Sequence, residues 1–198
     1  MLPATRVEKN TANNILLITS ETYSLHLEKN DISNNSIFSD AASASLITNC
    51  SNNNILDFIY GTDGSGAKNL ISQKNSFKNS SSNNSFFMNG AEVFKFALFE
   101  VPALVRKIIE KNDLNFEDID LFIFHQASKV VLNAIKRKLK IPDDKFFNNI
   151  IDIGNTVSST IPIALKDAIS KKKIKKGQLV LIAGFGVGYS WAGTIIRF

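Results

Sequence analysis

The sequence of 198 residues has 23 Lys and Arg against 18 Asp and Glu, a formal net charge of +5, with 44% hydrophobic and 21% charged residues. These proportions are ordinary for a globular protein and supply enough apolar material for a real core. The longest apolar run, residues 179–188, is too short for a bilayer-spanning helix, and a lone cysteine, Cys50, excludes an internal disulfide and a cysteine-rich metal site. We therefore expect a cytoplasmic protein without a metal or cofactor.

The positive charge favours an acidic partner, but the basic residues form no nucleic-acid-binding motif. Lysines are scattered among Asn and Ser rather than interleaved with aromatic side chains. The densest cluster, KKKIKKG at residues 171–177, follows a helix-like segment, where it is expected to complement the carboxyl end of the helix and solvate a turn. We predict neither a nucleic-acid partner nor a membrane partner.

The first third of the chain predicts strands joined by polar connections. NILLIT (residues 14–19) indicates a short buried strand, and residues 44–50 and 55–61 two more. GTDGSGAKN (residues 61–69) reads as a turn-rich loop; a phosphate loop is rejected because no helix follows at once and no Gly-Lys-Ser/Thr is present. Residues 75–85 are a low-complexity polar stretch, expected to form a surface loop.

The remainder alternates between helices and strands. Residues 92–112 predict a helix with one apolar face, and Pro102 predicts a kink or a division into two pieces. Further helices are expected at residues 127–139 and 158–170, and strands at residues 120–124, 146–153, 179–183 and 193–198. The order from residue 55 is thus βαβαβαββ, which predicts an α/β fold with a mostly parallel sheet and helices on its faces.

Three motifs follow or include buried strands. LFIFHQAS (residues 121–128) places His125 at the carboxyl end of an apolar strand, where α/β sheets usually bind ligands. GNTVSSTIP (residues 154–162) contains Asn155, and GFGVGYSW (residues 184–191) is a glycine-rich turn. The structural alternatives are that His125 only caps a strand or fills a core niche, and that the glycine turn is a tight connection requiring glycine for sterics alone.

In their order and spacing, and with the ending WAGTIIRF, these motifs resemble the carboxyl-terminal part of 3-oxoacyl-ACP synthase III, a thiolase-like condensing enzyme. The resemblance implies a thiolase-like fold of two similar halves, with residues 1–53 the tail of the first half and residues 54–198 a complete second half with a layered mixed sheet. FSDAASAS (residues 38–45) resembles a family segment in which glycines are usual at the places of Ser39 and Ala41, so an altered backbone is expected there.

The resemblance also implies a reaction, the decarboxylative condensation of an acyl thioester (acyl-CoA or acyl-ACP) with malonyl-ACP in fatty acid or related acyl biosynthesis. His125, through a ring N–H, and Asn155, through its amide, match two donors to the enolate oxygen. One such donor can contribute about 3 kcal/mol. The backbone N–H of Val187 matches a contributor to the oxyanion hole of the acylated cysteine, and Phe185 and Gly186 match the malonyl pocket.

Acyl carrier protein is the acidic partner that the resemblance implies. Lys95, Arg137 and Lys138 match basic positions of the family's docking face. Val130 stands where many relatives have an arginine, and Lys129 beside it is a candidate substitute, although one residue along a helix turns a side chain by about 100°. Ser128 replaces an asparagine common at that place.

The family's nucleophilic cysteine would precede residue 1, and Cys50, in SLITNCSNN, is predicted to be a small buried structural residue. One hypothesis is therefore a truncated or split condensing enzyme, or an incomplete gene model, acting as a homodimer or in a complex with a cysteine-bearing amino-terminal half. A second is a non-catalytic carrier-binding or assembly protein that retains the fold. A weaker third is a decarboxylase that uses His125 and Asn155 without a cysteine.

Overall fold

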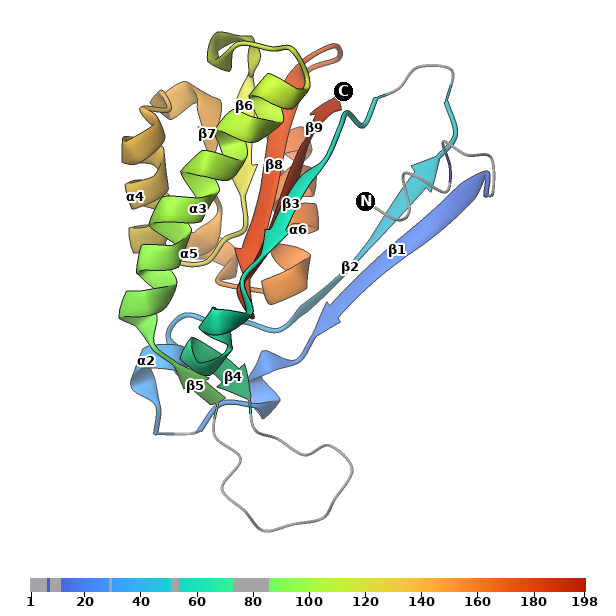
Figure 1. Ribbon diagram of the computed structural model, residues 1–198. Helices are drawn as coiled ribbons and strands as arrows, with labels where there is room; N and C mark the ends of the chain where they lie inside the picture. The colour runs from blue at the N-terminus through green and yellow to red at the C-terminus, as the bar shows by residue number, and fades with distance from the viewer. Residues whose placement is uncertain (1–6, 8–11, 29, 51–53, 73–85) are drawn as a thin grey trace.

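The computed structural model describes residues 7, 12–28, 30–50, 54–72 and 86–198 (Figure 1). Its main sheet has five strands in the order β3–β9–β8–β6–β7. The strands are β3 (Ile59–Thr62), β6 (Leu121–Phe124), β7 (Phe146–Phe147), β8 (Leu179–Gly186) and β9 (Ser190–Arg197). β6 runs parallel to β7 and β8, whereas β9 is antiparallel to β8 and β3. The α/β fold class and the layered mixed sheet that the family resemblance implies are confirmed, whereas the mostly parallel sheet expected from the element order is not found.

Helices of the same chain cover both faces of this sheet. α3 (Gly90–Lys111) and α4 (Lys129–Leu139) lie on one face and α6 (Thr160–Ser170) on the other (Figure 1). All four residues of β6 are buried, and β8 is buried at Leu179, Val180, Leu181 and Ala183. The continuous apolar runs in the sequence therefore do mark strands that are covered on both sides.

Pro102 lies inside α3 and does not divide it. A proline in a helix interior removes one hydrogen bond and normally costs about 3 kcal/mol. Here Val101, Pro102 and Leu104 are all buried in the packing of α3 against the sheet. Burial of this face outweighs the lost bond, so the expected division into two pieces was wrong, while the predicted apolar face is confirmed.

The strand predicted over residues 146–153 is only two residues long. β7 ends at Phe147, and a short helical turn, α5 (Ile150–Ile153), follows it. The backbone N–H of Asn149 donates to the side chain of Gln126 (3.1 Å), and Asn149 Nδ2 donates to Asp167 (2.8 Å). These side-chain partners replace the ladder that a longer strand would need.

The amino-terminal strands form a separate sheet. β1 (Asn14–Glu21) pairs antiparallel with β2 (Ala41–Thr48), and this two-stranded ribbon stands apart from the main sheet (Figure 1). The strand predicted at residues 14–19 is confirmed, but its predicted burial was wrong. Leu16, Ile18 and Leu46 are 58%, 63% and 64% exposed. A one-turn helix, α2 (Ile32–Asn35), lies in the connection between β1 and β2.

A short hairpin of β4 (Leu70–Ser72) and β5 (Phe86–Met88) precedes α3 and was not predicted. The surface loop expected at residues 75–85 lies outside the described residues. In the preceding loop, Gly61 and Gly66 leave room for the rings of Trp191 and Tyr189, which a Cβ at either position would overlap. The glycines of GTDGSGAKN thus have a packing role. None of the described helices is long and apolar enough to cross a membrane.

Candidate active site

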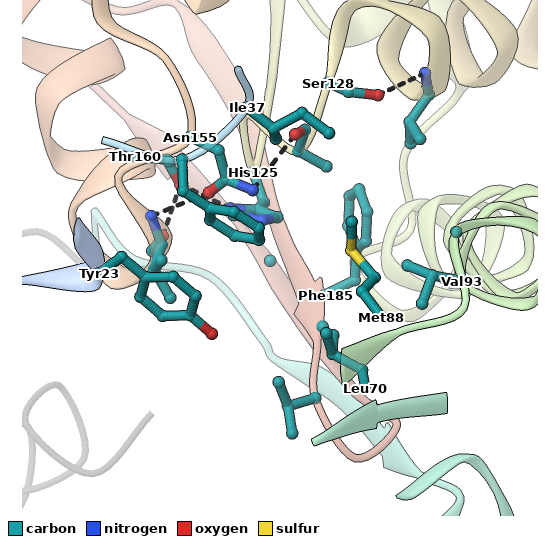
Figure 2. A pocket seen from close by; sticks show the side chains of 18 of the residues that line it. Tyr23, Ile37, Leu70, Met88, Val93, His125, Ser128, Asn155, Thr160 and Phe185 are labelled. Atoms are coloured by element: carbon teal, nitrogen blue, oxygen red, sulfur yellow. Dashed lines mark hydrogen bonds between the residues drawn. The ribbon is translucent and has the colours of Figure 1, made fainter. Parts of the chain in front are cut away.

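A pocket of about 590 Å³ opens at the carboxyl ends of β6 and β8. The walls come from α3, α4, the segment before α6 and the connection between β1 and β2 (Figure 2). The structure brings together here all of the residues that the sequence placed in the reaction and its malonyl pocket, namely His125, Asn155, Phe185, Gly186 and Val187.

His125 continues the edge of β6 into the pocket. Its backbone N–H donates to the carbonyl of Ala183 (2.9 Å), and its ring Nδ1 lies 2.7 Å from Thr160 Oγ1. The ring stands edge-on to Phe185, with centroids 5.4 Å apart. Burial lowers the pKa of His125 to about 4, with a backbone hydrogen bond to Val157 acting in the opposite direction. The imidazole is therefore neutral at pH 7 and carries one ring proton.

Asn155 is held on both sides of its peptide unit and is only 5% exposed. Its N–H donates to the carbonyl of Ile37, and its carbonyl accepts from the N–H of Ser39, both at 2.9 Å. Asn155 Oδ1 accepts the N–H of Val157 (2.9 Å), and Nδ2 donates to the carbonyl of Ala127 (3.2 Å). These bonds fix the amide orientation and engage one of the two Nδ2 hydrogens, so the amide has a second hydrogen for a ligand.

Two residues near this site, Gly154 and Val157, have a positive φ, whereas Ser39 and Ala41 do not. Gly154 has φ +79°, and Ser39 Oγ fills the space that a side chain at Gly154 would need. Val157 has φ 51°, a left-handed conformation that β-branched residues rarely adopt. Such strain is concentrated at functional sites.

The glycine turn is not explained by sterics alone. A Cβ at Gly186 or Gly188 would meet no atom within 4 Å, and one at Gly184 would make an ordinary contact with Ile161. None of the three has a φ in the left-handed region. The glycines therefore leave open space beside the pocket, where the backbone at Val187 can approach a ligand.

The opposite end of the pocket is apolar and was missed by the sequence analysis. Tyr23 stacks on Phe38 at 4.5 Å, and Phe86 meets both rings edge-on. Leu70 and Met88 of the β4–β5 hairpin complete this wall (Figure 2). Burial, and then the charge of Glu21, raise the pKa of Tyr23. No local pattern predicts this wall, because its residues are distant in sequence and converge only through the fold.

The predicted docking residues are exposed on α3 and α4: Lys95, Lys129, Arg137 and Lys138. Lys138 Nζ lies 4.5 Å from the ring centroid of Phe99, an exposed residue one turn after Lys95. Val130 is 66% exposed and lines the pocket, so this surface adjoins the pocket. Ser128 has a local role as the cap of α4, since its side chain accepts the N–H of Val131 (3.2 Å).

Cys50 lies two residues after β2 and is exposed, which corrects the expectation of a buried structural residue. It is not among the residues that line the pocket. Within the described residues, no group of three or more His, Cys, Asp or Glu side chains could hold a metal ion. The pocket thus offers hydrogen-bonding groups and no thiol of its own.

A mixed, helix-covered sheet with a His/Asn pair at its strand ends places the chain in the thiolase-like fold class. A solved 3-oxoacyl-(acyl-carrier-protein) synthase III has a TM-score of 0.94 and 37% identity, and covers 100% of this chain and 64% of its own. The enzyme of that name from Aquifex aeolicus VF5 has a TM-score of 0.91 and 31% identity, covering 100% and 62%.

Family comparison agrees with the fold. Residues 3–64 match the model for 3-oxoacyl-[acyl-carrier-protein (ACP)] synthase III, and residues 109–198 match the model for its C terminal region. Beta-ketoacyl-[acyl-carrier-protein] synthase III of Porphyra umbilicalis is 34% identical over 97% of this chain and 62% of its own length, and that of Campylobacter fetus is 34% identical over 97% and 61%. The chain belongs to the 3-oxoacyl-[acyl-carrier-protein] synthase III family and spans about three fifths of the length of these curated relatives.

Proposed function

We propose that this chain supplies the malonyl side of a 3-oxoacyl-ACP synthase III-type condensation. In that reaction the malonyl carboxylate leaves as CO₂, and the electron pair of the broken C–C bond forms an enolate. The enolate carbon attacks an acyl thioester, a C–C bond forms, and the thiolate leaves. The observation that carries the proposal is the convergence of His125, Asn155 and the Val187 backbone on one pocket.

Negative charge develops on the enolate oxygen during this reaction, and hydrogen-bond donors stabilise it. Asn155 Nδ2 has a hydrogen for the enolate oxygen, and the His125 ring lies beside it on the same pocket. The backbone N–H of Val187 is assigned to the oxyanion of the acyl thioester, and Phe185 and Gly186 to the malonyl pocket. Fixed donors in a site shielded from water stabilise such charge better than mobile water does.

The acyl group has to be held by a thiol outside these 198 residues, because Cys50 does not line the pocket. We assign that thiol to a cysteine-bearing amino-terminal half that completes the fold, with a homodimer as the alternative assembly. In the same proposal, residues 1–53 are the tail of the amino-terminal half and residues 54–198 the second half. One hydrogen bond supports this division: the Leu56 N–H donates to the carbonyl of Ile195 in β9 (2.9 Å), so the chain contacts the main sheet just after the boundary.

An acyl carrier protein is the proposed partner for both acyl and malonyl groups, with acyl-CoA as the other acyl donor. Lys95, Lys129, Arg137 and Lys138 are exposed on two packed helices beside the pocket mouth. An acidic carrier docked there would bring its thioester to the pocket. Attraction between exposed charges weakens over about 10 Å at 0.1 M salt, so docking should be salt-dependent.

The placement of Cys50 also favours a second candidate function, a non-catalytic carrier-binding protein. In that case the basic surface would bind carrier protein, and no thiol would be supplied. The two functions differ in whether adding a cysteine-bearing amino-terminal segment restores turnover. We expect the 198-residue chain alone to give no condensation of labelled acyl and malonyl thioesters, and the added segment to restore it. Turnover by the isolated chain that survives Cys50→Ser would contradict the proposal.

The roles of the polar pair can be tested in the completed enzyme by measuring malonyl decarboxylation and self-acylation separately. His125→Ala and Asn155→Ala should each lower decarboxylation by about 10²–10³-fold, the effect of losing one preorganised donor, and affect acylation less. Asn133→Ala, an exposed position on α4, is the matched control and should change neither rate. Equal losses in both assays would refute the assigned roles.

The docking surface can be tested by charge reversal. Lys95→Glu, Arg137→Glu and Lys138→Glu should weaken binding of acyl carrier protein at low salt, with a smaller loss as salt rises. Lys166→Glu is the control, because Lys166 is exposed on α6 at the other face of the sheet. Unchanged affinity in the three α3/α4 variants would place docking elsewhere.

A further inference from the structure

Phe99 presents an exposed aromatic ring within the basic surface of α3 and α4. The residue is 61% exposed, and Lys138 Nζ of α4 lies 4.5 Å from its ring centroid. Lys95 stands one turn earlier on α3, so Lys95 and Phe99 lie on the same side of the helix. Phe99 does not line the pocket and is not part of the main hydrophobic cluster. Apart from its contact with Lys138, packing within the described residues gives no reason for an aromatic side chain at this position.

The ring lies near the pocket mouth, on two packed helices that both begin there. Val93 of α3 and Val130 of α4 line the pocket. Phe99 and Lys138 lie about two turns further along the same helices, which is about 10 Å at 5.4 Å per turn. A carrier protein delivers its thioester on a flexible arm, so its folded body docks beside a pocket rather than inside it. The position of Phe99 therefore suits a contact with the body of a carrier whose arm enters the pocket.

Positive charge surrounds the exposed ring. Lys95, Arg137 and Lys138 are exposed, and the sequence of α4, KVVLNAIKRKL, contains no acidic residue. Glu92 and Glu100 of α3 offset part of this charge but leave an excess of cations around the ring. In protein interfaces, binding energy is concentrated at a few residues, often aromatic ones, that lie at the centre of a rim of weaker contacts. An aromatic ring with cations around it has this arrangement, and the cations select a partner with carboxylates.

We propose that Phe99 is the apolar anchor of the carrier-docking surface, and that the acidic carrier protein contacts it with an apolar side chain flanked by carboxylates. The inference rests on the proposed function and adds the chemistry of the contact to it. Exposed ion pairs contribute little and are screened by salt, so charge alone would discriminate poorly among acidic proteins. Burial of the ring adds a contribution that depends on apolar area rather than on charge. Lys138 can pair with a partner carboxylate while its ammonium stays over the ring, so the ionic and apolar contacts adjoin.

The test measures the affinity of the full 198-residue chain for acyl carrier protein at low and at high salt, by titration calorimetry. Phe99→Ala should weaken binding about tenfold at both salt concentrations, the effect of truncating an interface anchor. Phe99→Leu keeps an apolar side chain and should retain most of the affinity. Phe99→Lys separates the apolar contact from charge. If the surface were purely ionic, the added cation would strengthen binding of an acidic carrier. We expect weaker binding instead, most clearly at high salt, where the added charge is screened.

Tyr60→Ala is the matched control, because Tyr60 of β3 is 68% exposed and also aromatic. Its neighbour Ile59 packs against the core beneath α3, and successive side chains of a strand point to opposite faces, so Tyr60 points away from α3. Tyr60→Ala should leave carrier affinity unchanged. Phe99 is exposed, so its variants should keep the urea midpoint of the parent chain, which excludes general damage to the fold.

Each outcome decides the inference. If Arg137→Glu and Lys138→Glu weaken carrier binding but Phe99→Ala and Phe99→Lys do not, the basic docking surface stands and the role of Phe99 is wrong. A loss in Tyr60→Ala as large as that in Phe99→Ala would also overturn it. If the parent chain does not bind carrier protein, the docking proposal and this inference fail together. The assay requires no turnover, so a chain that does not condense thioesters can still show the contact.

Discussion

The β6–β8 pair and the β1–β2 pair are built from similarly apolar sequences but end in different environments. Phe122 and Leu181, on β6 and β8, are 0% exposed beneath α3 and α4. Leu16 and Leu46 lie opposite each other in the β1–β2 register and are 58% and 64% exposed. An apolar strand sequence therefore indicates that the strand has a surface suited to burial. It does not indicate that other elements of this chain cover that surface.

The exposed face of β1–β2 has the composition of a contact surface. The face consists of Asn14, Leu16, Ile18, Ser20, Ala42, Ala44, Leu46 and Thr48, and carries no charge. Uncharged apolar patches of this kind mark interaction sites or promote association. The chain also spans about three fifths of the length of its curated relatives, 62% for the Porphyra umbilicalis enzyme. The exposed face is where we expect a completing segment to pack.

The pocket lies at the junction of these two regions. Thr19 of β1 contacts Ser159, the residue before α6, through a 2.8 Å hydrogen bond, and Ile37 and Ser39 hold the backbone of Asn155. The apolar wall formed by Tyr23 and Phe38 also belongs to the amino-terminal region. The polar groups come from the carboxyl-terminal region, with His125 just after β6 and Asn155 just after α5. The connection between β1 and β2 positions Asn155 and closes the pocket.

The largest expected difference between the regions is in core stability. Leu181→Ala removes a fully buried side chain and should lower the free energy of unfolding by about 2–5 kcal/mol. Leu46→Ala is the same substitution on the exposed ribbon and should change it by less than about 0.5 kcal/mol. Urea unfolding of the two variants and the parent measures both values. Equal losses would show that the ribbon is covered in solution.

The second prediction concerns pH and the neutral His125. Its pKa is about 4 in the folded chain against 6.5 for an ordinary histidine, so between these values the unfolded chain binds more protons. Stability therefore rises with pH over this window, is fully present above about pH 6.5, and falls by about 3 kcal/mol toward pH 4, at 1.36 kcal/mol per pKa unit.

Unfolding measured across pH 4 to 7 should show this slope in the parent chain and lose most of it in His125→Gln. His26→Gln, in the amino-terminal region, is the control and should keep the slope because His125 is intact. A slope that survives His125→Gln would assign the pH dependence to other groups.

The sequence predicted the buried main sheet and the polar residues of the pocket because both have local signatures. Continuous apolar runs marked β6 and β8, and His125, Asn155 and the glycine turn stood at their ends or beside them. It did not predict the exposure of β1, the apolar wall of Tyr23 and Phe38, or the contact between Thr160 and His125. The wall and the contact depend on residues far apart in sequence, and the exposure of β1 depends on how the rest of the chain packs, which the apolar run itself does not encode.

The third prediction tests the close contact between Ser39 of the amino-terminal region and Gly154 of the carboxyl-terminal region. Gly154 has φ +79° and ψ −172°, a conformation that is essentially restricted to glycine, and Ser39 fills the space beside it. Gly154→Ala should therefore cost about 2 kcal/mol of stability and displace Asn155. Ser39→Gly combined with Gly154→Ala should recover the steric part of this loss but not the backbone part. If the two changes in the free energy of unfolding simply add in the double variant, there is no steric contact energy between Ser39 and the side chain at position 154.

The smallest expected stability change comes from the exposed ribbon itself. Leu16→Glu with Leu46→Lys places opposite charges on a cross-strand pair, which sheets tolerate or favour by a few tenths of a kcal/mol. Urea unfolding of the chain should therefore stay within about 0.5 kcal/mol of the parent value. Self-association, measured by sedimentation over a range of concentrations, should decrease because the apolar patch is broken. Binding of a cysteine-bearing amino-terminal segment should weaken in the same variant, since both processes use this face.

The control variant is Lys166→Glu with Lys173→Glu, two exposed positions in or just after α6, which should leave association and segment binding unchanged. If the Leu16→Glu/Leu46→Lys chain associates as strongly as the parent, the ribbon is not the contact surface, and its apolar character would need another cause.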